Sequence, residues 1–153
     1  MVTGEPDEQL LRALGEEILR MNARRSTTYA DAVLESSAFR LLWVLHESGP
    51  RTLRELSEEL QLERSTINRQ VNAAIRHGHL ERVEEPGVKA PRVRPTPAGE
   101  QAYVHDGRLR GAAYSRALAD LGSERAEEMV TALRAFNDAL DDVHAEQPGP
   151  PTS

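Results

Sequence analysis

Most apolar residues of this chain recur three or four positions apart, a spacing that places them on one face of an α-helix. The second such segment, from Phe39 to Leu45, is apolar nearly all round and is therefore expected to be central and buried. The first and last segments each carry one apolar stripe. The pattern predicts helices over residues 7–25, 36–46, 52–60, 63–77, 97–121 and 123–145.

The sequence also marks a hairpin and several helix ends. The runs 80–84 and 92–96 are short and β-compatible, and "EPGVKAP" between them contains the Gly and Pro residues of an exposed turn. Thr52 and Glu55 have the spacing of a capping box, in which each side chain bonds the backbone N–H of the other residue. Gly78 follows a helix at the position where a left-handed residue is expected.

The order of these elements is helix, helix, short turn, helix and β-hairpin, which is that of a winged helix-turn-helix. We therefore predict a mainly α fold with a small β-hairpin. A winged helix-turn-helix core over residues 34–96 is flanked by N- and C-terminal helices. The length of 153 residues suits one domain. We expect a single domain over residues 1–153, ending in a disordered tail over 147–153.

The composition limits the chemistry that is available. The chain has no Cys, which excludes disulfides, Cys-based metal sites and thiol redox sensing. It contains no apolar run of membrane-spanning length and no signal-peptide pattern at its start, so we expect a cytoplasmic protein without a membrane partner. The sequence shows no Gly-rich phosphate loop and no nucleophile–base constellation, so we expect no enzymatic activity and no cofactor.

The net charge of −6 hides an uneven distribution. The segment from Arg64 to Arg94 contains seven basic and three acidic residues, so its charge is +4 and that of the remainder is −10. A basic segment within an acidic body is a normal electrostatic footprint for a protein that binds DNA. By itself, such a segment is equally compatible with an ordinary solvated surface.

The fourth helix, over residues 63–77, has two contrasting faces. If Ile67, Val71 and Ala74 point inward, the opposite face is polar and contains no acid. A helix in the major groove needs side chains that donate and accept hydrogen bonds at base edges, and it must not bring carboxylates to the phosphates. A polar face without a partner is the alternative. The candidates for DNA contact here are Arg64, Ser65, Thr66, Asn68, Arg69, Gln70, Asn72 and Arg76.

The segment from Phe39 to Gln101 resembles the core of MarR-type transcriptional regulators. The family's helix-turn-helix, its "G.l.R" entry into the wing and its "LT..G" entry into a long helix correspond here to "LQLERSTINRQV", "HGHLERV" and "PTPAGE". The resemblance implies a regulator that binds double-stranded DNA. The recognition helix, 63–77, is then expected in the major groove, and the wing, 80–96, near the minor groove.

The wing departs from the family pattern. Members of the family commonly carry Asp-x-Arg there, with the Arg in the minor groove and the Asp holding the wing in place. In this sequence Gly87 and Lys89 occupy those positions. Lys89 is the only lysine of the chain, and it keeps the charge but not the planar fork of Arg. We therefore expect minor-groove contact from Lys89 and, in part, from Arg92.

The resemblance also implies a homodimer in which the outer helices intertwine around a two-fold axis. The segments 7–30 and 97–145 are the expected dimerisation helices, because they carry more apolar surface than a small winged helix can cover. Packing of these helices within one chain is the alternative. A two-fold dimer presents two recognition helices one DNA turn apart, which predicts a pseudo-palindromic operator. We predict that the protein acts as a repressor.

Many family members bind a small aromatic or acidic effector between the dimerisation helices and the winged helix. The sequence by itself favours a simpler role for Trp43, as a residue of the core, and for Tyr29, as the anchor of a loop. Both interpretations stay open. The candidates for an effector pocket are Met21, Tyr29, Trp43 and His46.

A different class of function is also consistent with the sequence. A winged-helix scaffold that binds other proteins, without specific DNA binding, is suggested by the acidic body and by the missing wing Asp. A metal site is not expected. The compact pair His77 and His79 lies at a predicted helix end, where histidines more often interact with the helix dipole than with a metal.

Overall fold

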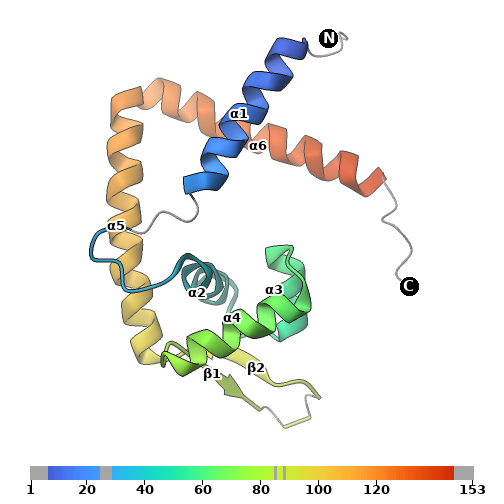
Figure 1. Cartoon of the computed structure of the whole chain (residues 1–153), viewed down its shortest axis with the longest axis vertical. Helices are drawn as coiled ribbons and strands as arrows, with labels where there is room; N and C mark the ends of the chain where they lie inside the picture. Colours follow the sequence, from blue (N-terminus) through green and yellow to red (C-terminus); the bar gives the residue numbers. More distant parts are fainter. Residues whose placement is uncertain (1–6, 25–28, 85, 88, 147–153) are drawn as a thin grey trace. The chain divides into compact units, whose positions relative to one another are not determined.

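The helices and strands follow the order predicted from the sequence (Figure 1). A computed structural model describes residues 7–24, 29–84, 86–87 and 89–146, and the predicted tail over 147–153 lies outside them. The predicted class, mainly α with a small β-hairpin, is confirmed. The elements are α1 (Glu8–Arg24), α2 (Ser36–Ser48), α3 (Leu53–Leu60), α4 (Arg64–Arg76), β1 (Leu80–Val83), β2 (Arg92–Pro95), α5 (Pro97–Leu121) and α6 (Ser123–Glu146).

The chain divides into two compact units, Met1–Leu109 and Arg110–Ser153. The first unit contains α1 to the first half of α5, and therefore the whole winged helix-turn-helix. The second contains the rest of α5 and α6, which are joined through Gly122, a glycine with a φ of 84°. The expectation that residues 1–153 form one domain stays a prediction.

The core of the first unit is built around α2. This helix packs against α3, α4 and β2, and each of these elements contributes apolar side chains to one cluster. The helix periodicity of the sequence placed most of these residues on the inner faces. The cluster comprises Leu34, Leu41, Leu42, Val44, Leu45, Leu56, Ile67, Val71, Ala74, Leu80, Val93 and Ala102.

The expectation that α2 is buried on nearly all sides is wrong on one side. Trp43 is 53% exposed, and His46 and Glu47 are exposed with it. At 100° per residue these three side chains share one side of α2, opposite the arc that contains Leu41 and Leu45. The winged-helix elements cover that buried arc, so the placement of Trp43 as a core residue is wrong as well.

The two strands pair in an antiparallel hairpin whose register decides where each side chain points. Leu80 pairs with Pro95, and Arg82 pairs with Val93. Leu80 and Val93 are buried, so Arg82 lies on the inner face of the hairpin, next to α4. Arg51 extends the sheet by one bridge, because its backbone N–H and C=O both bond Val93.

The turn after α4 holds the start of α5 through backbone contacts. The N–H groups of Gly78 and His79 bond the carbonyls of Ile75 and Ala74, the pattern of a Schellman C-cap with Gly78 at a φ of 77°, as predicted. The carbonyl of His79 then accepts the N–H of Thr96 at 3.0 Å and lies against the α-carbon of Gly99. Only a residue without a β-carbon permits that approach.

A buried carboxylate on α5 holds the segment that leads into α2. Asp106 is 1% exposed, and its two oxygens accept the N–H groups of Val33 and Leu34 at 3.0 and 2.9 Å. His105 Nδ1 lies 3.0 Å from the same carboxylate. Burial alone would raise the pKa of Asp106, but the hydrogen bonds outweigh burial and hold this pKa below its usual value. This contact was not predicted from the sequence.

The Gly99→Ala substitution should destabilise the first unit by about 1–3 kcal/mol, because the added methyl group meets backbone atoms of His79 that cannot rotate away. Thermal unfolding followed by circular dichroism measures the loss. Gly107→Ala, in the same helix, is the matched control: its β-carbon meets nothing within 4 Å, so it should leave the melting temperature unchanged or raise it. Equal losses in both variants would contradict the close approach.

The Asp106→Asn substitution should lower stability at neutral pH, because the Val33 and Leu34 N–H groups bond different carboxylate oxygens and Asn replaces one of these acceptors with an NH₂ donor. The folded pKa of Asp106 is lowered, so its stabilisation is complete above the unfolded value of about 3.9 and is lost as pH falls through the folded value. The stability difference between wild type and variant should therefore be constant above about pH 5 and shrink in acid. A difference that persists unchanged at low pH would contradict this role.

Candidate nucleic-acid interface

The helix-turn-helix is formed by α3, a three-residue turn and α4. The predicted capping box is present, since Glu55 N–H bonds Thr52 Oγ1 at 3.2 Å and Thr52 N–H bonds Glu55 Oε2 at 2.7 Å. The N–H and hydroxyl of Thr52 hold the pKa of Glu55 below its usual value, with smaller contributions from nearby arginines. Gln61 then turns the chain with a φ of 53°, and Ser57 Oγ donates to the carbonyl of Leu62 at 2.6 Å. These bonds fix the angle at which α4 begins.

The two predicted faces of α4 are present. Ile67, Val71 and Ala74 are buried in the core, with Ile75 packed against them. The opposite side carries no acid and is open to solvent. Of the predicted DNA-contact residues, Arg64, Ser65, Asn68, Arg69 and Arg76 are exposed, and Thr66, Gln70 and Asn72 are half-buried.

Arg82 of β1 reaches the flank of α4 that faces the hairpin. Its Nη2 donates to Asn72 Oδ1 at 2.9 Å and to Asn68 Oδ1 at 3.3 Å. Asn72 Nδ2 also lies 3.4 Å from Asn68 Oδ1. Arg82 was not among the site residues predicted from the sequence. The signal that reveals it is its position two residues after the buried Leu80, on the same face of the strand.

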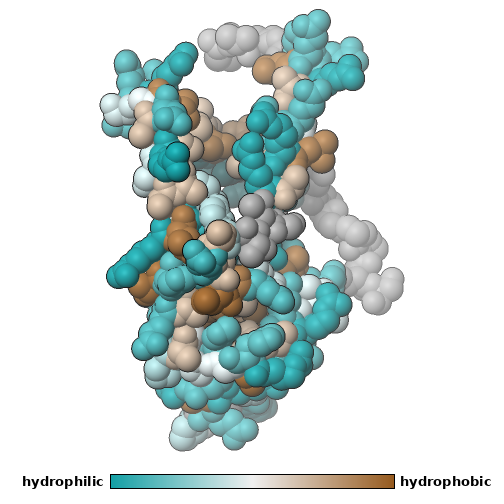
Figure 2. Space-filling view, turned by 60° about the vertical axis from the view of Figure 1, so that its left-hand side comes forward, coloured by the Kyte–Doolittle hydropathy of each residue, from teal (hydrophilic) through white to brown (hydrophobic). Residues whose placement is uncertain are grey.

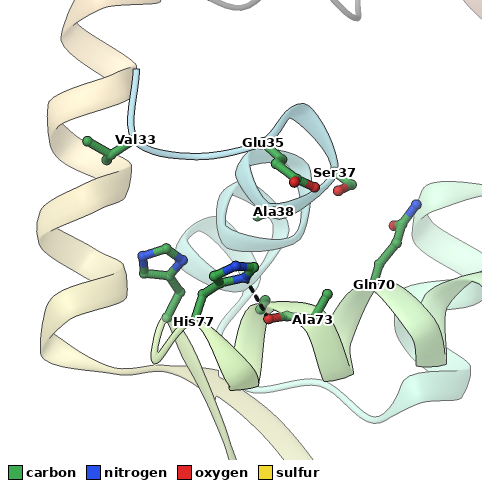
Figure 3. Close-up of a pocket in the computed structure, with 9 residues that line it drawn as sticks. Val33, Glu35, Ser37, Ala38, Gln70, Ala73 and His77 are labelled. Carbon is green, nitrogen blue, oxygen red and sulfur yellow. Dashed lines mark hydrogen bonds between the residues drawn. The ribbon is translucent and has the colours of Figure 1, made fainter. Parts of the chain in front are cut away.

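Gln70 lies on the other flank of α4, facing the start of α2, and not on the outer face. It lines a cavity of about 170 Å³ (Figure 3). Its Oε1 is buried and has no hydrogen-bond partner in the part of the chain that the structure describes. This position does not suit the base or phosphate contact predicted for Gln70. The other lining residues are Val33, Glu35, Ser37, Ala38, Ala73, Ala74, His77 and His79.

The hairpin residues predicted to meet DNA differ in placement. Lys89 is exposed, two residues beyond Gly87, where the chain turns with a φ of 85°. Arg92 is half-buried, and its charge helps to lower the pKa of Glu55, after the Thr52 hydrogen bonds. Arg92 Nε is buried and has no hydrogen-bond partner among the described residues. The Arg92 side chain is therefore close enough to Glu55 of α3 to act on its charge, and the minor-groove contact predicted for Arg92 stays a prediction.

The residues predicted to line an effector pocket are mostly exposed. Met21 and Trp43 are 56% and 53% exposed, and Tyr29 is half-buried. The His46 ring lies 4.8 Å from that of Tyr103, and its Nδ1 is 3.3 Å from Glu100 Oε2. None of the four lines the cavity beside Gln70. An effector site formed by these four residues stays a prediction.

His77 lies at the end of α4, as predicted. Its Nδ1 is 2.9 Å from the carbonyl of Ala73 (Figure 3). Its ring also stacks on that of His79. Across the described ranges, no three His, Cys, Asp or Glu side chains are grouped to hold a metal ion. Among the described helices, none has the length and apolar character required to cross a membrane.

Comparison with known proteins identifies the fold. Residues 34–89 match the model of the MarR family. No curated protein matches the chain. The MarR family transcription regulator SP03579 shares 21% identity with a TM-score of 0.78, over 92% of this chain and 95% of that one.

Two further structures have the same fold. A mutant of E. coli MarR complexed with operator DNA shares 18% identity at a TM-score of 0.70, over 82% of this chain and 94% of that one. Bordetella bronchiseptica BpsR shares 18% identity at a TM-score of 0.69, over 85% of this chain and 99% of that one. Its structure concerns the regulation of DNA binding by 6-hydroxynicotinic acid. The family match over residues 34–89 and the common fold confirm the resemblance to MarR-type winged-helix regulators that was predicted from the sequence.

Proposed function

We propose that this chain is a homodimeric repressor that reads a pseudo-palindromic operator. In this proposal α4 enters the major groove, the wing over residues 80–96 lies near the minor groove, and a small aromatic or acidic effector releases the DNA. The observation that carries the proposal is the exposed face of α4, which presents arginines, amides and a hydroxyl without any acid. Because its target is chromosomal DNA, we place the protein in the cytoplasm.

The exposed face of α4 suits base and phosphate contact in its chemistry. Arg69 and Arg76 lie at the outermost part of the helix, opposite the buried Ile67, and both are exposed. Arg binds guanine through two parallel hydrogen bonds, whereas Asn suits adenine. Residues early in a recognition helix usually contact bases, and later ones meet the backbone. We therefore assign Ser65, Asn68 and Arg69 to base edges and Arg76 to a phosphate.

Apolar surface on the outer helices supports the dimer. No residue of α1 or α6 is buried, although both helices carry stripes of large apolar side chains. The space-filling view in Figure 2 shows brown apolar patches among teal polar ones on the surface of the molecule. Surfaces of this kind mark protein–protein contacts. The exposed apolar residues are Leu10, Leu11, Ile18, Leu19 and Met21 of α1, and Met129, Val130, Leu133, Leu140 and Val143 of α6.

Two structural relatives support the same proposal. One relative is complexed with operator DNA, and the DNA binding of the other is regulated by 6-hydroxynicotinic acid, a small aromatic acid. Both share the fold of this chain at 18% identity. The competing function is a protein-interaction scaffold without specific DNA binding, and the next experiment distinguishes the two.

The Arg69→Met substitution should weaken binding to a pseudo-palindromic fragment from the region upstream of the protein's own gene. Loss of a bidentate base contact costs about 1–3 kcal/mol. Titration followed by fluorescence anisotropy, at one fixed moderate salt concentration, measures the change. Gln70→Met is the matched control, because the Gln70 side chain faces the cavity beside α2. This variant should bind the fragment with the affinity of the wild type.

Failure of the wild-type protein to bind this fragment more tightly than random DNA would contradict the regulator proposal and favour the scaffold. Equal losses in the Arg69→Met and Gln70→Met proteins would contradict the assignment of the outer face of α4 to DNA.

The Leu133→Glu substitution should convert the dimer to a monomer, because it places a charge in the apolar stripe of α6, where Leu133 is 40% exposed. Light scattering coupled to size-exclusion chromatography measures the mass. Thr131→Glu lies on the opposite side of α6 and should leave the dimer intact. A wild-type protein that is monomeric at micromolar concentration would contradict the dimer.

A further inference from the structure

Arg82 lies where the hairpin meets the recognition helix, although its position in β1 gives no hint of a role in reading DNA. The strand register places it on the inner face with Leu80. Leu80 is buried in the core, whereas Arg82, two residues further along, extends past the edge of the core to the flank of α4. Its guanidinium therefore contacts the two amide side chains of that flank, Asn68 and Asn72.

The hydrogen-bond chemistry fixes which way these amides face. A guanidinium has donors only, so the atoms that contact Arg82 Nη2 must be the amide oxygens of Asn68 and Asn72. Asn68 Oδ1 also has Asn72 Nδ2 at 3.4 Å, so both of its acceptor positions are directed at side chains of the protein. The Asn68 side chain is exposed, and the group it offers to solvent is its NH₂, which is a donor.

This orientation changes what Asn68 recognises. A free Asn reads adenine with one donor and one acceptor, because adenine presents the N7 acceptor and the N6 donor in the major groove. Guanine presents two acceptors, N7 and O6. An amide whose oxygen is already occupied offers donors alone, which complement guanine and leave the N6–H of adenine without an acceptor.

We propose that Arg82 is a specificity-determining positioning residue, which holds the Asn68 and Asn72 oxygens so that α4 favours guanine over adenine at the base that Asn68 meets. This inference rests on the proposed DNA-binding function. Arg82 acts through Asn68 and does not itself need to touch the base.

The hairpin provides a matched control. Arg94 is an exposed arginine on β2, but it pairs with Glu81 on the opposite face of the hairpin, where its Nε lies 2.7 Å from Glu81 Oε1. It carries the same charge as Arg82 and lies in the same two-stranded sheet, yet the register turns it away from α4. Replacing either arginine with Met therefore removes one positive charge from the wing, but only the replacement of Arg82 removes the contact with Asn68.

The test is selection of binding sites from a random double-stranded DNA library, followed by sequencing, for the wild type, Arg82→Met and Arg94→Met proteins. The wild type should select guanine at one position in each half-site, and the Arg82→Met protein should shift that position toward adenine by about tenfold or more. The Arg94→Met protein should select the wild-type sequence, with affinity reduced evenly across all sites.

A second pair of variants tests whether Arg82 acts through Asn68. Asn68→Ala should abolish the guanine preference, and adding Arg82→Met to it should cause no further change at that position. Arg82→Lys keeps the charge and the aliphatic stem but not the planar fork, so its base preference should also shift from guanine toward adenine, but by less. This variant provides a second test in case the Arg82→Met protein does not fold. Circular dichroism confirms that each variant is folded.

Identical base preferences in the wild type and both Arg82 variants would overturn the inference. Equal losses of DNA affinity in the Arg82→Met and Arg94→Met proteins, independent of sequence, would overturn it as well. Failure of the wild type to enrich any sequence would overturn the proposed DNA-binding function and this inference with it. The two failures are therefore distinguishable.

Discussion

The burial of one side of α4 is the constraint on which the rest of the winged helix depends. Ile67 and Val71 are fully buried against α2, α3 and the hairpin, and this fixes the rotation of the helix about its axis. Once the rotation is set, every other side chain of α4 has a determined direction, at 100° per residue. Arg69 points outward, Asn68 points to the hairpin, and Gln70 points to the start of α2.

Each side of α4 therefore has its own chemistry. The hairpin flank carries amides that meet Arg82, and the α2 flank carries Gln70 and small alanines beside a cavity. Only the outermost strip is open to a large partner. A substitution on α4 therefore has different consequences for DNA binding and for stability according to the flank it occupies, even between neighbouring positions such as Arg69 and Gln70.

Residue periodicity and local hydrogen-bond rules predicted the elements, because these depend on neighbours in the sequence. The capping box at Thr52, the left-handed Gly78 and the inward face of α4 are all local features, and all are confirmed. The contacts of Asp106 and Arg82 were not predicted, because their partners lie more than 70 and about 10 residues away and depend on tertiary packing. Trp43 was misplaced because apolarity alone does not show which arc of α2 the other elements cover.

The pairing of charges explains how an acidic chain presents a basic surface. Several arginines outside α4 are neutralised locally, with Arg51 held by Glu59 and Arg94 by Glu81. Within α4 there is no acid, and no ion pair to Arg64, Arg69 or Arg76 occurs among the described residues. These three charges therefore act outward over a distance of about 8–10 Å at physiological salt, the range set by screening. The acid next to α4 is its N-cap residue Glu63, and the other acids lie further away in the sequence, so the net charge of −6 does not describe the field that a phosphate meets beside α4.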